Sequence, residues 1–121
     1  TFAGPVTVNG IPWPFSDGET VQLPAGRHEL RRGGGEPALR VLHANLDLLA
    51  VHRARIGLDF DYKADAGGLV LVDRRPGKVW IDGVRVQPKI LESPRHWTIM
   101  LPRGRHRARI NAPAALVSRV D

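Results

Sequence analysis

Residues 78–84 read Lys-Val-Trp-Ile-Asp-Gly-Val, and this stretch decides the fold because the chain contains a second version of it. Its last four residues, Ile-Asp-Gly-Val, match Val-Asn-Gly-Ile at 8–11. A second signature, Leu-Pro-x-Gly-Arg-His, follows at 101–106 and has its counterpart at 23–28. The offset between copies is 73 residues at the first signature and 78 at the second, so the later copy has five extra residues between them. Two signatures repeated in the same order predict that the chain contains two copies of one structural unit.

The repeated dipeptides predict β-hairpins. Asn9-Gly10 and Asp82-Gly83 each follow a short run of alternating apolar and polar residues, and both tolerate the positive φ that a tight hairpin turn requires. Ten prolines and thirteen glycines are spread between the other short apolar runs. This punctuation is typical of an all-β chain with many turns, and it argues against a helical bundle.

The apolar runs predict about eight to ten strands, which is the pattern of an immunoglobulin-like antiparallel β-sandwich. In the clearest strand, 56–63, Leu58, Phe60 and Tyr62 should face the core. The run 69–72 is apolar on both faces and should be a central strand or one sandwiched between layers. Residues 46–55 fit either a short helical turn or an irregular strand. We expect residues 1–121 to form a single sandwich domain, with repeat copies at about 6–31 and 76–110.

The net charge of +6 is concentrated in the second copy. Seven basic residues and one acidic residue lie between Arg85 and Ile110, whereas the rest of the chain is balanced. In the last strand of that copy Arg105, Arg107 and Arg109 alternate with His106, Ala108 and Ile110. The alternation predicts a row of three arginines on one face of one strand.

Several classes of function find no support in the sequence. The chain has no cysteine, which excludes a disulfide, a thiolate nucleophile and a cysteine-based zinc site. It has no Gly-x-Ser-x-Gly, no phosphate loop and no His-Glu-x-x-His, so we predict no catalytic residues, no metal site and no cofactor. No apolar run is long enough for a membrane helix, so membrane insertion is not expected. Because no nucleic-acid-binding fold accompanies the basic strand, nucleic acid is not a predicted partner.

The second copy resembles a family. The run from Arg75 to Gly83, then Pro88, then the run from Ile99 to His106 is similar to the PEGA-type module, a small β-sandwich repeat. The first copy resembles it more loosely, and residues 39–72 have no counterpart in that pattern. The resemblance implies an extracytoplasmic β-sandwich attached to a larger bacterial surface or carbohydrate-related protein. It implies no catalytic residue.

Two tryptophans are candidates for carbohydrate binding, because an exposed flat ring can pack against the C–H face of a sugar. By alternation Trp80 lies on the polar face of its strand, and Trp13 lies in a loop flanked by prolines. The plainer interpretation is that the loop folds Trp13 over the sandwich and that a neighbouring segment covers Trp80. Trp97 is predicted to be a core residue.

The arginine row suits an anion, since a guanidinium group can bind a carboxylate or phosphate with two hydrogen bonds. The plainer interpretation is a solvated strand face. Asp59 and Asp61 lie roughly 7 Å apart by strand geometry, within the range of inverting glycosidases, but neighbours on one open face usually share one environment. With Asp65 they could also contribute oxygens to Ca²⁺, although no recognised calcium loop is present. His28 and His106 occupy equivalent places in the two copies, which favours a shared turn-stabilising or packing role over metal binding.

Two hypotheses result. The first is a non-catalytic accessory domain of a larger carbohydrate-active protein, secreted or periplasmic, that binds or positions polysaccharide, including acidic polysaccharide, through Trp13, Trp80, Arg105, Arg107 and Arg109. The second is a docking module that packs against its parent catalytic domain and binds no glycan itself. Because the chain starts at Thr1, both hypotheses take it as a fragment of a longer protein.

Overall fold

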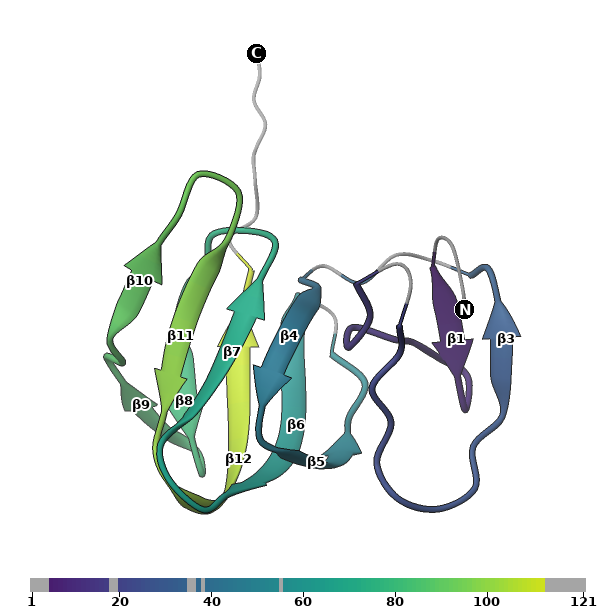
Figure 1. Cartoon of the computed structure of the whole chain (residues 1–121), viewed down its shortest axis with the longest axis horizontal. Coiled ribbons are helices and arrows are strands. Elements are labelled where there is room, and N and C mark those ends of the chain that lie inside the picture. The colour runs from purple at the N-terminus through teal and green to yellow at the C-terminus, as the bar shows by residue number, and fades with distance from the viewer. Residues whose placement is uncertain (1–4, 18–19, 35–36, 38, 55, 113–121) are drawn as a thin grey trace.

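The computed structural model describes residues 5–17, 20–34, 37, 39–54 and 56–112, and these residues form an all-β fold without helices (Figure 1). The twelve strands are β1 (Val6–Val8), β2 (Ile11–Pro12), β3 (Leu30–Arg32), β4 (Val41–Asn45), β5 (Asp47–Val51), β6 (Gly57–Ala64), β7 (Gly68–Val72), β8 (Val79–Ile81), β9 (Val84–Val86), β10 (Ile90–Glu92), β11 (Trp97–Leu101) and β12 (Gly104–Asn111). The prediction of an all-β chain is confirmed. Within the described residues no helix has the length and apolarity that a membrane span requires.

The strands form three antiparallel sheets. A five-stranded sheet has the order β5-β6-β12-β8-β9, and a four-stranded sheet has the order β10-β11-β7-β4. These two lie face to face as a sandwich, and a three-stranded sheet, β2-β1-β3, lies beyond β4 and β5 (Figure 1). Strand β7 is central in its sheet, as its apolar composition predicts.

One hydrophobic cluster includes buried residues from all three sheets. Leu58, Phe60 and Tyr62 of β6 are at most 1 % exposed, which confirms the predicted inward face of that strand. Phe15, which follows β2, packs edge-on against Phe60 with ring centroids 5.0 Å apart. The first copy and the sandwich therefore share a core.

Residues 47–51, within the ambiguous segment, form strand β5, so the irregular strand is confirmed and the helical turn is wrong. The register of β5 against β6 shifts between Leu48 and Ala50. A bulge places two residues opposite one, and it therefore breaks the strict alternation by which a strand is recognised in sequence.

The two copies of the repeat have the same topology. The order β2-β1-β3 of the first copy corresponds to the order β9-β8-β12 of the second. Both hairpins turn at residues with positive φ: 51° at Asn9 and 80° at Gly10, 52° at Asp82 and 83° at Gly83. These pairs match the type I′ turn, whose twist suits a two-residue hairpin, so the predicted turns are confirmed.

In both copies the same two hydrogen bonds, one between backbone groups and one to a side-chain oxygen, hold the turn against the segment that contains or follows the second signature. In the first copy the Asn9 N–H donates to the Glu29 carbonyl at 2.8 Å, and Asn9 Oδ1 accepts from the Glu29 N–H at 2.8 Å. In the second copy the Asp82 N–H donates to the Arg107 carbonyl at 2.8 Å, and Asp82 Oδ1 accepts from the Arg107 N–H at 2.9 Å. Glu29 and Arg107 are 78 residues apart, the offset of the second signature. The two copies therefore share individual hydrogen bonds as well as the order of their strands.

The surroundings of the two copies differ. Strand β12 pairs with β8 on one side and, over eight residues, with β6 on the other. Its counterpart β3 pairs with β1 only, and no described strand lies along its other edge. Strand β12 of the second copy therefore lies inside a sheet of the sandwich, whereas β3 of the first copy is an edge strand of its small sheet.

Candidate functional site

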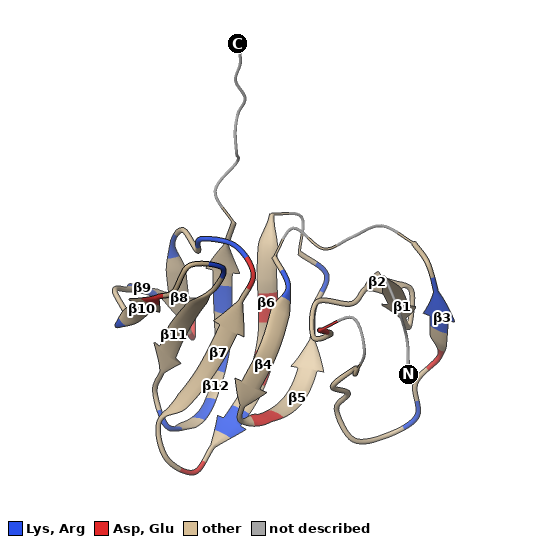
Figure 2. Ribbon diagram, turned by 45° about the horizontal axis from the view of Figure 1, so that its top comes forward, with Lys and Arg blue, Asp and Glu red and all other residues tan. Residues whose placement is uncertain are grey.

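The outward side of the five-stranded sheet, here called the charged face, carries most of the predicted site. Alternate residues of β6, β8, β9 and β12 point away from the core, and the registers place them in cross-strand rows. One row runs from Asp59 through Arg109 and Trp80 to Arg85. Figure 2 shows basic residues along β12 and an acidic residue on the neighbouring β6.

Arg107 is held by a carboxylate of the next strand. Its Nε and Nη2 donate to the two oxygens of Asp59 at 2.8 and 2.9 Å. These bonds stabilise the charged form and raise the pKa of the Arg107 guanidinium. The Arg107 side chain stays half open to solvent, whereas Asp59 is largely covered. Asp59 thus orients a guanidinium that remains accessible.

Trp80 and Arg109 form a second pair on the same face. The two residues are opposite each other in the β8–β12 register, and the Arg109 guanidinium carbon lies 5.5 Å from the Trp80 ring centroid. A cation over an aromatic ring at this distance is attracted by the ring, by about 0.5–1 kcal/mol at an exposed site. Trp80 is half-buried, between the two possibilities that the sequence left open, a free ring and a covered one.

The turn after β8 contributes a charged pair. Asp82 Oδ2 lies 2.6 Å from His106 Nδ1, and the Arg103 carbonyl oxygen lies 2.8 Å from His106 Nε2. Only the imidazolium form has a proton on both ring nitrogens for two oxygen acceptors. The bond to Asp82 and then the bond to the Arg103 carbonyl raise the pKa of His106. The same imidazole, followed by the Arg107 N–H, lowers the pKa of Asp82.

A surface pocket of about 440 Å³ brings these groups together. It is lined by Asp59, Trp80, Asp82, Gly83, Arg107 and Arg109. One aromatic ring, two guanidinium groups and two carboxylates therefore converge at the turn of the second copy. We take this pocket, called the Trp80 pocket below, as the candidate site.

Trp13 does not belong to the site. It is 4 % exposed, and its indole Nε1 donates to the Gln22 carbonyl at 2.8 Å. The prediction that Trp13 could present a free ring is wrong, because the proline-flanked segment folds the ring into the core, where its one polar atom finds a backbone acceptor. Trp97 is half-buried and packs against the same core, as predicted.

The predicted arginine row exists, but its members differ in their surroundings. Arg105, Arg107 and Arg109 are all exposed on one face of β12. Arg107 is paired with Asp59 and Arg109 lies over Trp80, whereas Arg105 lies opposite Lys63 and outside the pocket. Arg105 therefore contributes charge near the site without lining it.

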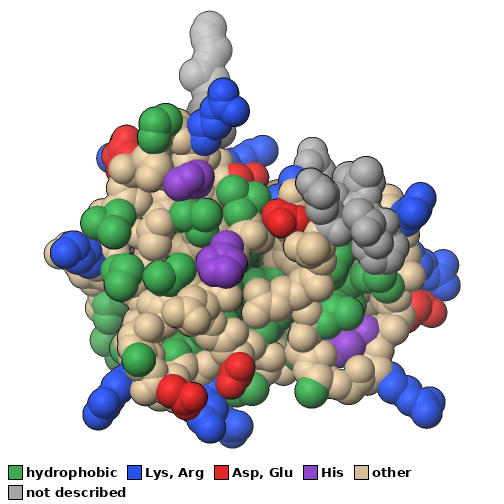
Figure 3. All heavy atoms as spheres, in the orientation of Figure 1, with side chains coloured by type: hydrophobic (Ala, Val, Ile, Leu, Met, Phe, Trp, Pro, Cys, Tyr) green, Lys and Arg blue, Asp and Glu red, His purple; other side chains and the backbone are tan. Residues whose placement is uncertain are grey.

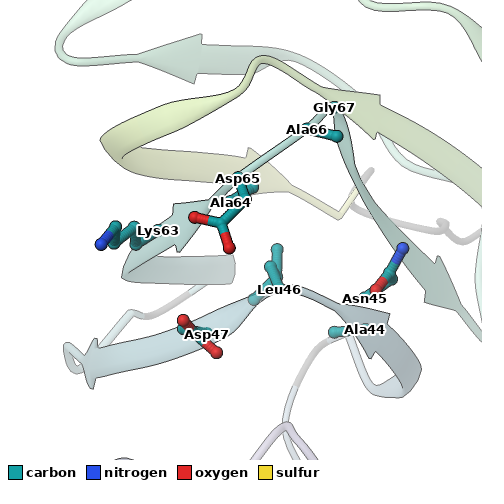
Figure 4. Close-up of a pocket in the computed structure, with 9 residues that line it drawn as sticks. All are labelled: Ala44, Asn45, Leu46, Asp47, Lys63, Ala64, Asp65, Ala66 and Gly67. Carbon is teal, nitrogen blue, oxygen red and sulfur yellow. The ribbon is translucent and has the colours of Figure 1, made fainter.

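The aspartates weighed as catalytic or calcium-binding groups are engaged separately. Asp59 binds Arg107, and Asp61 Oδ2 lies 3.1 Å from His52 Nε2. Asp65 lines a different pocket, of about 390 Å³, between the β4–β5 and β6–β7 connections. Figure 4 shows Asp65 and Asp47 on opposite sides of that pocket, with Lys63 extending away from it. In the described part of the chain no three His, Cys, Asp or Glu side chains gather to hold a metal ion.

The opposite surface of the sandwich is more apolar than the charged face. The outward side of the four-stranded sheet, here called the apolar face, includes residues of all four strands: His43, Asn45, Leu69, Leu71, Leu91, Thr98 and Met100. None of these residues is a Lys, Arg, Asp or Glu, and Leu91 is 49 % exposed. Figure 3 shows hydrophobic side chains gathered on this side of the molecule.

Asp59, which the sequence suggested only as a catalytic or calcium-binding group, and Asp82 were not assigned to the carbohydrate site. Asp82 could have been found by comparing the copies, because it is charged where Asn9 is neutral. Comparing the copies could not identify Asp59, because its pairing with Arg107 depends on the β6–β12 register.

Comparison of the chain with protein-family models, with curated protein sequences and with solved structures finds no match. The likeness to the PEGA-type module therefore stays a prediction.

Proposed function

We propose that this chain is a non-catalytic accessory module of a larger extracytoplasmic carbohydrate-active protein, and that it binds polysaccharide in the Trp80 pocket. The observation that supports this function is the meeting of Trp80 with Arg107, Arg109, Asp59 and Asp82 in one pocket. The extracytoplasmic setting and the parent protein rest on the resemblance of residues 75–106 to the PEGA-type module.

The chemistry of the pocket suits a sugar. A pyranose has an apolar C–H face and a rim of hydroxyl groups, so it needs a flat apolar surface beside fixed polar groups. Trp80 supplies the apolar surface, and Arg109, whose guanidinium carbon lies 5.5 Å from the ring centroid, supplies hydrogen-bond donors beside it. The bidentate bond to Asp59 fixes Arg107, which lowers the entropy lost when a ligand binds.

The test is affinity electrophoresis in gels that contain neutral or acidic polysaccharides, with the variants Trp80→Ala and Val84→Ala. We expect at least one polysaccharide to retard the wild type, and Trp80→Ala to weaken binding about tenfold or more, since aromatic anchors dominate such sites. Val84 is 65 % exposed on the adjacent β9 and does not line the pocket, so its replacement should leave retardation unchanged. If no polysaccharide retards the wild type, the proposed function is wrong.

The apolar face favours a second candidate, a docking module that packs against its parent catalytic domain. Leu71 lies in the middle of that face, between Thr98 and His43 in the register. If docking is the function, Leu71→Asp should abolish binding of the parent domain added in trans and leave polysaccharide retardation unchanged. Equal binding of the parent domain by wild type and Leu71→Asp would exclude this face.

A further inference from the structure

The two carboxylates of the Trp80 pocket are already neutralised. Both oxygens of Asp59 accept from Arg107, and the oxygens of Asp82 accept from His106 and from the Arg107 backbone. The charges of Asp59 and Asp82 are therefore balanced by Arg107 and His106, so neither carboxylate is left to pair with a further cation.

The two arginines of the pocket can still donate hydrogen bonds to a ligand. A guanidinium has five N–H groups, and Asp59 occupies two of those of Arg107, so three remain. Arg109 lies over Trp80 and forms no ion pair with any described residue. With His106 as imidazolium, three cations, Arg107, Arg109 and His106, face the two carboxylates of the pocket. A third carboxylate, Asp61, lies opposite Arg107 in the register and 3.1 Å from His52, and Arg85 on β9 adds a cation beside Trp80.

We infer that the ligand of the Trp80 pocket is an anionic glycan, and that Arg107 and Arg109 bind one of its carboxylate or sulfate groups while a sugar ring packs on Trp80. This inference rests on the proposed function and adds the chemical class of the ligand. Arg107 and Arg109 are two residues apart on one strand face, which places their Cα atoms about 7 Å apart. Their planar groups can therefore reach a single acid group, to which guanidinium forms paired, charge-assisted hydrogen bonds.

The first copy provides an internal control for this chemistry. Arg31 of β3 occupies the position of Arg109, and Thr7 opposite it occupies the position of Trp80. Arg31 Nε lies 3.3 Å from Glu29 Oε1, so its charge is balanced by a residue of its own segment. The same strand position thus carries a neutralised arginine without an aromatic ring.

The charge of His106 predicts the pH dependence of binding. The ring faces Asp82 from the β8–β9 turn, the carbonyl of Arg103, and Tyr62 of β6 at a centroid distance of 5.9 Å. Burial and then the charge of Asp82 raise the pKa of Tyr62 to about 12, so this phenol is neutral at physiological pH. When His106 loses its proton, Asp82 is no longer balanced. Affinity for an anion should therefore fall as pH rises through the raised pKa of His106.

The experiment measures binding, by calorimetry at about 100 mM salt, of two pairs of polymers: polygalacturonate with its fully methyl-esterified form, and dextran sulfate with dextran. We expect at least one charged polymer to bind about tenfold more tightly than its neutral partner, which corresponds to one strong charge-assisted contact. Arg109→Gln should remove most of this difference, and Arg31→Gln should change it less than about twofold. The pair that shows the difference identifies carboxylate or sulfate as the recognised group.

Each other outcome has a distinct meaning. If neutral and charged polymers bind equally and Trp80→Ala weakens both, the anionic inference is wrong and the proposed function stands. If Arg31→Gln and Arg109→Gln weaken binding equally, the attraction is general to this basic protein and the assigned site is wrong. If none of the four polymers binds, both the inference and the proposed function fail.

Discussion

In the first copy Thr7, Asn9 and Glu29 occupy the positions that Trp80, Asp82 and Arg107 occupy in the second. The backbone bonds between turn and strand are the same in both copies, with N···O distances of 2.8 Å at Asn9 and 2.8 Å at Asp82. The side chains around those bonds have different chemistry: hydroxyl, amide and acid in one copy, and indole, carboxylate and guanidinium in the other. Residues that the copies share build the turn, and residues that they do not share form the Trp80 pocket.

The histidines show the same contrast. His28 Nδ1 lies 3.0 Å from Asn9 Nδ2, and since Asn9 Oδ1 already accepts from Glu29, the amide donates and this nitrogen accepts. His28 Nε2 then donates to the Pro24 carbonyl at 2.8 Å. His28 needs one ring proton for its two bonds, whereas His106 needs two. A single change from Asn to Asp turns a neutral contact into an ion pair.

The largest expected difference between the copies lies in their core positions. Ala108 on β12 is 0 % exposed, while the equivalent Leu30 on β3 is only partly buried. Ala108→Asp would bury a charge without a partner and should cost more than about 3 kcal/mol, whereas Leu30→Asp at the open sheet should cost about 1 kcal/mol. Urea denaturation of the two variants measures both losses. Equal losses of stability would contradict the conclusion that Ala108 is more deeply buried than Leu30.

The turns should respond alike and more weakly. Gly10 and Gly83 have φ values of 80° and 83°, and an added Cβ at Gly83 would meet nothing within 4 Å. At Gly10 the nearest atom is the end of the Arg53 side chain at 3.9 Å. Backbone strain alone should therefore cost about 1 kcal/mol in Gly10→Ala and in Gly83→Ala. Denaturation midpoints that differ strongly between the variants would show that the turns are not equivalent.

The smallest expected effect is a pH dependence confined to the second copy. Because the folded state raises the pKa of His106, the stability from its bond to Asp82 is present below pH about 6.5 and is lost as pH rises through the folded pKa. At the acidic end, the lowered pKa of Asp82 means that the contribution is lost as pH falls through that lower value. Asp82→Asn should flatten the decline above pH 6.5, and Asn9→Asp should add a similar decline from the first copy. The unfolding temperature, followed from pH 5.5 to 8.5, measures both changes.

Patterns local in sequence predicted the elements that depend on local chemistry. The offsets of 73 and 78 residues and the Asn-Gly and Asp-Gly pairs predicted both hairpins, and alternation predicted the buried side of β6. Strand β5 was ambiguous because a bulged strand and a helix can space their apolar residues alike. Two prolines around Trp13 indicated an irregular segment, but its direction over the core depends on packing between distant residues.

The site itself was only partly predictable. Alternation placed Trp80 on the polar face of its strand and the three arginines on one face of another strand, and both placements are confirmed. Only the pairing of β8 with β12 brings them onto the same face of one sheet. The bond between Arg107 and Asp59 joins residues 48 positions apart and runs diagonally across the β6–β12 register, which pairs Arg107 with Asp61 and Arg109 with Asp59. Strand register is a tertiary property, so no local pattern could show which arginine would be held and which would stay free.

Amide chemical shifts of the whole chain, followed during a titration with polysaccharide, show in a single measurement whether ligand binds in the Trp80 pocket, where the two copies differ. We expect shifts at the Trp80 indole and at the backbone amides of Asp82, Gly83, Arg107 and Arg109. We expect none at the equivalent Thr7, Asn9, Gly10, Glu29 and Arg31. Equal shifts in the two copies, or shifts confined to the apolar face around Leu71, would contradict binding in this pocket.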